Sequence, residues 1–150
     1  MIYFVFAVLL FLDRITKIWA NQWLINEGSM EFIKGLLGFT YVENRGVAFG
    51  MLADKLYIML PVTIIVAIIL IAVYMKNRGE SKLFDISLLL VITGAIGNIA
   101  DKIIRGCVVD FIEFKFMDFP VFNLADIYVC VGAMLLVIYV LFGEKNENSK

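Results

Sequence analysis

An uncharged run of 20 residues, from Leu56 to Met75, is the feature that most limits how this chain can fold. A helix rises about 1.5 Å per residue, so this run is long enough to cross the hydrocarbon core of a bilayer, which is about 30 Å thick. The chain of 150 residues is 62% hydrophobic and only 18% charged, whereas a soluble domain is normally about half apolar. We therefore expect one integral membrane domain that covers residues 1–150.

Three other apolar segments repeat this pattern and predict further helices that cross the membrane. Residues 86–100 and 127–143 carry no charge, and the N-terminal segment is apolar except for three ionisable residues in its second half. The predicted spans are residues 2–24, 56–75, 84–104 and 122–143. The fold class that we predict is an all-α membrane protein with four transmembrane helices.

The connections between these spans contain signals for β-strands. Residues 39–42, Phe-Thr-Tyr-Val, favour a strand and lie in a segment punctuated by glycines. Residues 109–116 alternate in character, which places Asp110 and every second residue up to Phe116 on one face of another strand. The sequence therefore predicts a small β-sheet in the loops that connect the helices.

Four spans place both strand-forming segments on one side of the membrane and the two termini on the other. The short loop on the side of the termini contains Lys76, Arg78 and Lys82, and cytoplasmic loops are enriched in lysine and arginine. We therefore expect a multi-pass protein whose termini are both cytoplasmic. The β-sheet then lies in the extracytoplasmic loops.

The composition excludes several kinds of chemistry. The chain contains no histidine, which removes the Ser-His and Cys-His nucleophile pairs and most zinc sites. Its two cysteines, Cys107 and Cys130, are too few and too far apart for a metal cluster. The net charge of -1 comes from scattered residues that form no basic face. We expect no metal, no cofactor and no nucleic-acid partner.

Polar residues near the end of the third span are candidates for function. A charged side chain at membrane depth costs at least about 2.5–3.5 kcal/mol, so such residues are usually functional. Gly94, Gly97, Asn98 and Asp101 recur at helical spacing and form one narrow stripe. Small residues in a stripe are typical of close helix packing. Packing alone, however, does not require the carboxylate of Asp101.

Asp126, at the start of the fourth span, has two interpretations. Asn123 and Asp126 have the spacing of a capping box at a helix N-terminus. Alternatively, Asp110 approaches Asp126, and two carboxylates close together in a poorly hydrated site cannot both ionise. Such a pair, sharing one proton, activates water in aspartic proteases. In that hypothesis Asp126 is the ionised partner because a helix N-terminus favours negative charge, and Asp110 holds the proton.

Two further groups have both a structural and a functional interpretation. Asp13 and Lys17 are four residues apart and can form an ion pair within the first span, which is a sufficient structural reason for both. Asn44 offers a donor and an acceptor, and Gly46 permits close backbone approach, so this segment suits an extended peptide beside an active site. The alternative for the second group is a turn followed by apolar anchoring.

Five motifs in this order resemble those of one known family. Residues 13–17 resemble a D-x-x-T-K motif, residues 44–49 an N-x-G-x-A-F segment, and residues 94–101 a G-A-x-G-N-x-x-D motif. Residues 108–111 and 122–126 are similar to two catalytic segments. The family is that of the lipoprotein signal peptidases (signal peptidase II), which are bacterial inner-membrane aspartic proteases. The resemblance covers nearly the whole chain.

The resemblance implies cleavage of prolipoprotein signal peptides just before a diacylglyceryl-modified cysteine, at an active site near the outer face of the membrane. It makes Asp110 and Asp126 the catalytic pair. The positions that it assigns to substrate binding or to support are Asn44, Gly46, Asn98, Asp101, Lys102, Asn123, Asp13 and Lys17. The implied partners are diacylglyceryl-modified prolipoproteins and membrane lipid, and we expect the protein to act as a monomer.

One position departs from the family's pattern. Lys102 follows Asp101, where the family usually carries arginine. Lysine cannot provide the bidentate fork of a guanidinium group. Arg105, one turn further along, is the residue available to replace it.

Two other classes of protein also place acids in membrane spans. One is a small ion or proton transporter, and the other is a membrane scaffold whose acids only cap and pair. Transport favours acids spread across the depth of the bilayer, whereas Asp101, Asp110 and Asp126 cluster at one side. The sequence therefore favours a peptidase.

Overall fold

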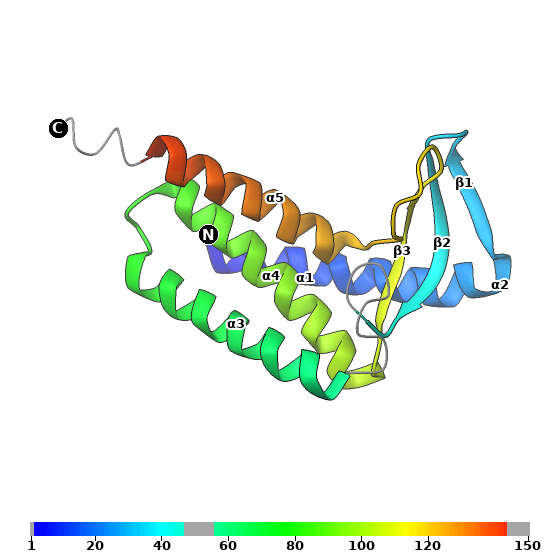
Figure 1. Ribbon diagram of the computed structural model, residues 1–150, viewed down its shortest axis with the longest axis horizontal. Coiled ribbons are helices and arrows are strands. Elements are labelled where there is room, and N and C mark those ends of the chain that lie inside the picture. Colours follow the sequence, from blue (N-terminus) through cyan, green and yellow to red (C-terminus); the bar gives the residue numbers. More distant parts are fainter. Residues whose placement is uncertain (1, 47–55, 144–150) are drawn as a thin grey trace.

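In the computed structural model, four long helices lie side by side and a three-stranded sheet stands across one end of them (Figure 1). The structure describes residues 2–46 and 56–143. The helical elements are α1 (Ile2–Trp19), η1 (Ala20–Leu24), α2 (Ile25–Glu27), α3 (Leu56–Asn77), α4 (Lys82–Arg105), α5 (Leu124–Ile138) and η3 (Tyr139–Gly143). The strands are β1 (Ser29–Ile33), β2 (Leu37–Asn44) and β3 (Val108–Phe114). The π-helical segments η1 and η3 continue α1 and α5.

Helix α4 is the central element and packs against α1, α3 and α5. Near its N-terminal end, Leu88 and Ile92 form a buried apolar cluster with Tyr74 of α3. Gly132 of α5 lies against the backbone of α4, where an added Cβ would come within 2.7 Å of the carbonyl oxygen of Ser87. Close apolar packing therefore holds this end of the bundle together.

Three of the helices are long and apolar enough to cross a membrane, namely Tyr57–Asn77, Lys82–Arg105 and Leu124–Phe142. The fourth, α1, carries the charged residues of the N-terminal segment. Its Asp13 and Lys17 are buried, and large apolar side chains cover its outer surface. The charged groups of α1 thus face the other helices. The predicted fold class, an all-α membrane protein with a small β-sheet, is confirmed: the structure is mainly helical, has three such spans, and carries one small sheet, which is antiparallel.

The limits of the helices differ from the predicted spans by a few residues. The predicted range 122–143 begins before the helix does, because Asn123 is the N-cap of α5 and Phe122 pairs with Ile112 in an isolated β-bridge. The range 2–24 ends too early, because helical backbone continues through η1 and α2. Helices α3 and α4 extend beyond their predicted ranges by up to two residues at an end.

The sheet is antiparallel, in the order β1-β2-β3, and one face of it is anchored to the end of α1. Val109 and Phe111 of β3 are buried against Ala20 of η1. The ring of Trp19 meets the rings of Phe39 and Phe111 edge to face, with centroids 5.5 and 6.2 Å apart. These contacts fix the position of β3 relative to the helices.

The regular alternation predicted for residues 109–116 is only partly correct. Strand β3 ends before Phe116, which lies beyond the sheet. The register between β2 and β3 also shifts by one residue between Phe39 and Val42, where a β-bulge interrupts the ladder. Beyond the bulge Val42 pairs with Asp110, so the bulge sets the position of this aspartate in the sheet.

The segment before α5 pairs with β3 and brings two distant parts of the chain together. The carbonyl oxygen of Phe122 accepts hydrogen bonds from the backbone N–H groups of Phe111 and Ile112, at 3.0 and 2.8 Å. The N-cap of α5 therefore lies directly beside the strand that carries Asp110.

Candidate active site

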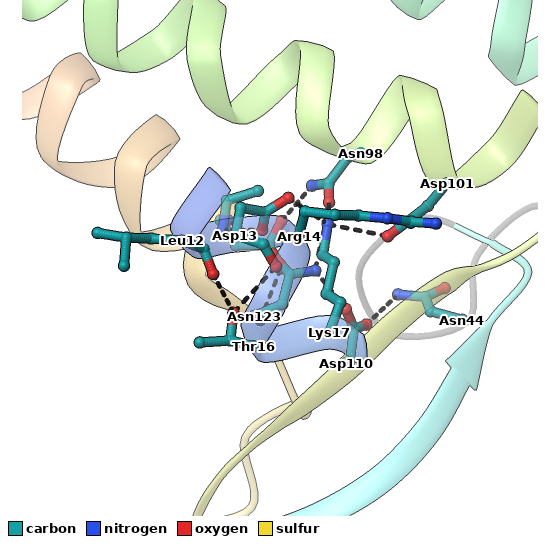
Figure 2. A network of polar contacts seen from close by, with 12 residues as sticks. Leu12, Asp13, Arg14, Thr16, Lys17, Asn44, Asn98, Asp101, Asp110 and Asn123 are labelled. Atoms are coloured by element: carbon teal, nitrogen blue, oxygen red, sulfur yellow. Dashed lines mark hydrogen bonds and ion pairs between the residues drawn. The ribbon is translucent and has the colours of Figure 1, made fainter. Parts of the chain in front are cut away.

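Polar side chains gather where α1, α4, β3 and the start of α5 meet (Figure 2). Several are excluded from solvent: Asp101 is 1% exposed, Asp110 is 2% and Asn123 is 0%. The cluster has two parts that differ in the partners of their carboxylates. We call Asp13, Arg14, Lys17 and Asp101 the ion-paired half, and Asn44, Asn98, Asp110, Asn123 and Asp126 the amide-bonded half.

The ion-paired half is centred on Lys17. Its Nζ lies 3.0 Å from Asp13 Oδ2 and 2.9 Å from Asp101 Oδ2, so the predicted pair of Asp13 and Lys17 is confirmed. Arg14 Nη1 binds the other oxygen of Asp101 at 2.9 Å. Asp13 Oδ1 accepts a hydrogen bond from the backbone N–H of Ala125, at 3.1 Å. Asp13 therefore connects α1 to the first turn of α5.

Glycines of α4 make these approaches possible. A Cβ added at Gly97 would lie 2.5 Å from Asp13 Oδ2, and one added at Gly94 would collide with the carbonyl oxygen of Ala125. The predicted stripe of Gly94, Gly97, Asn98 and Asp101 therefore serves both close helix packing and the polar cluster. Its glycines admit α1 and α5, and its Asn98 and Asp101 enter the cluster.

In the amide-bonded half, Asp110 is bound by two side-chain amides. Its Oδ2 accepts from Asn44 Nδ2 at 2.9 Å, and its Oδ1 accepts from Asn123 Nδ2 at 2.6 Å. Burial raises the pKa of Asp110 from its ordinary 3.8 to about 6, and the nearby negative charge of Asp126 acts in the same direction. A carboxyl group of this kind can hold a proton close to neutral pH.

Asp126 lies in the first turn of α5 and completes a capping box with Asn123. The backbone N–H of Asn123 donates to Asp126 Oδ2 at 3.0 Å, and the N–H of Asp126 donates to Asn123 Oδ1 at 3.0 Å. Asn123 also binds Asp110, so one residue contacts both acids. The two interpretations of Asp126 are therefore compatible, because the capping box is what holds this aspartate beside Asp110.

Asn98 connects the two halves of the cluster. Its Oδ1 accepts from Lys17 Nζ at 2.9 Å, and its Nδ2 donates to Asp126 Oδ1 at 2.8 Å. A longer contact of 3.3 Å joins Asn98 Oδ1 to Asn123 Nδ2. Figure 2 shows this amide between Lys17 and the start of α5.

Lys102 lies one turn beyond Asn98 and is half-buried. Its ammonium group is close enough to Asp110 and Asp126 to interact electrostatically with both. Arg105, the suggested replacement for the arginine usual in the family, interacts with Tyr41 and Cys107. The structure therefore places Lys102 beside the two acids and directs Arg105 toward another neighbourhood.

The segment that contains Asn44 is only partly described. Asn44 Oδ1 accepts the backbone N–H of Gly46 at 2.9 Å while its Nδ2 binds Asp110. This turn directs the Asn44 amide at the catalytic candidate. Residues 47–49 of the same motif lie outside the described residues.

Sequence reasoning missed two contributors to the cluster. Arg14 was not assigned a role, and its partner Asp101 is 87 positions away. The backbone N–H of Ala125, which binds Asp13, is 112 positions from it. No local pattern predicts either contact. In the described part of the chain, no three His, Cys, Asp or Glu side chains are grouped to hold a metal ion.

A bundle of apolar helices with a pair of amide-bonded aspartates at one end, one buried and one half-buried, defines a multi-pass membrane enzyme whose candidate reactive groups are carboxylates. The family of signal peptidase (SPase) II has a model that matches residues 5–142, and the chain belongs to this family. It is therefore a membrane protease of prolipoprotein processing.

Individual relatives and solved structures agree with this assignment. The lipoprotein signal peptidase of Clostridium tetani is 39% identical, over 93% of this chain and 91% of its own length. That of Caldanaerobacter subterraneus subsp. tengcongensis is 44% identical, over 91% of this chain and 92% of its own length. Two bacterial membrane enzyme structures, obtained by the in meso method at 2.3 and 1.9 Å resolution, are both 30% identical. Their TM-scores are 0.89 and 0.85. The first match covers 99% of this chain and 91% of the solved chain, and the second covers 94% and 92%.

Proposed function

We propose that this protein cleaves prolipoproteins directly before a diacylglyceryl-modified cysteine, and that Asp110 and Asp126 activate the attacking water. The observation that carries the proposal is the double contact of Asn123, which binds Asp110 through its side chain and Asp126 through its backbone. Two carboxylates held by one residue in a poorly hydrated site form a unit that retains one proton. Such a unit supplies a base and an acid at the same time.

In the proposed reaction, ionised Asp126 takes a proton from water while the water oxygen adds to the scissile carbonyl carbon. Protonated Asp110 donates its proton to the carbonyl oxygen, which gives a neutral tetrahedral intermediate. The C–N bond then breaks, the proton on Asp126 passes to the departing amine, and the hydroxyl proton returns to Asp110. The products are the carboxyl end of the signal peptide and the free amino group of the lipid-modified cysteine.

The two roles follow from the surroundings of each acid. The raised pKa of Asp110, about 6, favours the partner that starts with the proton. Asp126 lies at a helix N-terminus, where the macrodipole and the capping N–H groups favour negative charge. Asn44 and Gly46 sit at the edge of the site on β2 and its following turn, which suits them to bind an extended substrate backbone.

The proposal includes an orientation in the membrane. The site lies at the end of the bundle that carries the sheet, and the parity of four spans puts that end opposite the two termini (Figure 1). The enrichment of Lys76, Arg78 and Lys82 at the other end supports cytoplasmic termini in the bacterial inner membrane. The active site then opens near the outer face, where a monomer meets the lipid-modified substrate.

The test is incubation of the purified protein with a prolipoprotein in its diacylglyceryl-modified form and in its unlipidated form. We expect cleavage of the lipidated form only, with the new N-terminus at the modified cysteine by mass spectrometry. Asp126→Asn serves as the inactive enzyme, and Asp118→Asn, at an exposed position, is the matched control that should retain activity. Equal cleavage of both forms contradicts the proposed specificity. Failure of well-folded protein to cut either contradicts the proposed function.

A further inference from the structure

Lys17 is a buried cation for which the proposed reaction has no direct use. Its side chain is 1% exposed and lies 3.0 Å from Asp13 Oδ2 and 2.9 Å from Asp101 Oδ2. Its third contact is with the oxygen of the Asn98 amide, at 2.9 Å. An ammonium group has three N–H donors and no acceptor. Three acceptor oxygens therefore surround its three donors, although the contact with Asp101 Oδ2 is an ion pair without hydrogen-bond geometry.

The contact with Asn98 fixes which way that amide points. Because Lys17 can only donate, the atom of Asn98 that faces it must be the oxygen. The NH₂ group consequently faces Asp126 and donates to its Oδ1 at 2.8 Å. An amide turned the other way would direct its oxygen at the Asp126 carboxylate and its NH₂ at the ammonium, so both contacts would become repulsive.

The orientation of Asn98 matters because it completes the solvation of one acid. Asp126 Oδ1 accepts from Asn98, and Asp126 Oδ2 accepts from the backbone N–H of Asn123. Hydrogen bonds donated to a carboxylate favour its ionised form. The two amides on Asp110 act in the same direction, but burial outweighs them there. Asp126 is less buried than Asp110, so it is the acid that these hydrogen bonds favour as the anion and base of the proposed reaction.

We propose that Lys17 is a positioning residue that acts through Asn98 to keep Asp126 ionised, and so assigns the shared proton of the pair to Asp110. This inference rests on the proposed function of the two aspartates. Lys17 does not touch the reacting atoms in this assignment. Its effect reaches the base through one amide, that of Asn98, which Figure 2 shows joined to Lys17 by a dashed line.

The charges around the site favour a relay through Asn98 over a direct effect of the Lys17 charge. Lys17 and Arg14 of α1 face Asp13 of α1 and Asp101 of α4, so two cations meet two carboxylates and the ion-paired half has no net charge. The other charged groups near Asp126 are Lys102 of α4 and Asp110 of β3. Lys17 itself lowers the pKa of Asp110, but less than burial raises it and less than the hydrogen bonds from Asn44 and Asn123 lower it.

The experiment compares Lys17→Met, Asn98→Ala and the double variant in the cleavage assay across pH. If the relay operates, Lys17→Met lowers kcat about 10- to 100-fold, the range typical of residues that orient a reactive group, and changes KM less than about 2-fold. The acid limb of the kcat profile moves to higher pH, because the pair of acids loses a hydrogen bond that favours its ionised form. The double variant is no slower than Asn98→Ala alone, since both changes interrupt one path.

Matched variants separate this role from folding and from a loss of charge. Arg14→Met removes the other cation of the ion-paired half, which does not contact Asn98, and should leave the acid limb in place. If Lys17→Met does not fold, Lys17→Met/Asp101→Asn keeps the net charge of the buried network and is measured instead. Additive effects of Lys17→Met and Asn98→Ala, or an unmoved acid limb, overturn the relay. If the relay fails in this way while the wild-type protein cleaves and Asp126→Asn does not, the proposed function of the two aspartates still stands.

Discussion

The two halves of the polar cluster contain carboxylates whose surroundings are similar in burial but opposite in kind. Asp101 and Asp110 are 1% and 2% exposed. Asp101 is bound by two cations, Lys17 and Arg14, whereas Asp110 is bound by two neutral amides, Asn44 and Asn123. The difference is therefore in the charge of the partners and owes little to solvent access.

This contrast separates carboxylates that hold a structure together from carboxylates that can exchange a proton. Protonation of a buried acid that is paired with a cation leaves that cation without its partner, which is costly. An acid bound by amides keeps its hydrogen bonds in place while its proton comes and goes, and burial raises the pKa of Asp110 to about 6. The first kind connects helices, and the second kind is available for catalysis.

The largest effect that tests this comparison is the loss of turnover on neutralising the amide-bonded acids. We expect Asp110→Asn and Asp126→Asn each to lower kcat by at least about 1000-fold, because each removes one proton-transfer step. Neither should lower the thermal stability of the purified protein by more than a few degrees, since asparagine keeps a similar shape. Substantial activity in either variant would show that the pair is not the catalytic unit.

Neutralising an ion-paired acid should mainly lower the stability of the protein, whereas neutralising an amide-bonded acid should mainly lower its activity. Asp101→Asn leaves Lys17 and Arg14 with one carboxylate fewer, and breaking a buried pair from one side costs about 3–5 kcal/mol. We expect a loss of about 3 kcal/mol in the free energy of unfolding, measured by denaturant titration in detergent micelles. Asp118→Asn, which alters an exposed carboxylate, is the control and should change stability little. Equal stability of the two variants would contradict the division into halves.

The pH dependence of stability should distinguish Asp110 from an ion-paired acid. The folded protein retains the proton of Asp110 up to about pH 6, whereas the unfolded chain releases it near pH 3.8. Wild-type protein therefore loses stability as the pH rises from about 4 to about 6, by about 2–3 kcal/mol, and Asp110→Asn does not. The measurement is the difference in unfolding free energy between the two proteins at several pH values. A constant difference would argue against a raised pKa.

The smallest effects come from single methyl groups added at two glycines, one on α4 and one on α5. In Gly97→Ala the added Cβ meets Asp13 Oδ2, and in Gly132→Ala it meets the carbonyl oxygen of Ser87. Overpacking of this kind costs about 1–3 kcal/mol, so both variants should unfold more easily. Only Gly97→Ala should also slow cleavage, because Asp13 holds the first turn of α5. A similar loss of activity in Gly132→Ala would mean that the site is sensitive to any disturbance of the bundle.

Local features of the site were predictable, and contacts between distant elements were not. The pair of Asp13 and Lys17 and the capping box of Asn123 and Asp126 both depend on spacings of three or four residues along one helix. The bond from Lys17 to Asn98 spans 81 positions and depends on how α1 packs against α4. No spacing rule gives that packing, so the connection between the two halves appears only in three dimensions.

The fold shows the same limit at the start of α5. Uncharged runs predicted the helices, because a bilayer requires length and apolarity from each one. The predicted range 122–143 nevertheless began too early, since the carbonyl oxygen of Phe122 is used by two N–H groups of β3. The bulge in β2 likewise shifted the register of the strand that carries Asp110. Both differences come from pairing between segments that are far apart in the sequence.

The bond between Asp13 and Ala125 sets an order of events during synthesis. Asp13 belongs to α1 and Ala125 to α5, 112 positions later, so the acceptor of this bond is synthesised well before its donor. Until α4 and α5 arrive, Asp13 and Lys17 lack the partners that these helices supply, and Asp126 has not yet been made. A chain interrupted before α5 therefore lacks both Asp126 and the bond that ties α5 to α1, so the polar cluster forms only once α5 is in place.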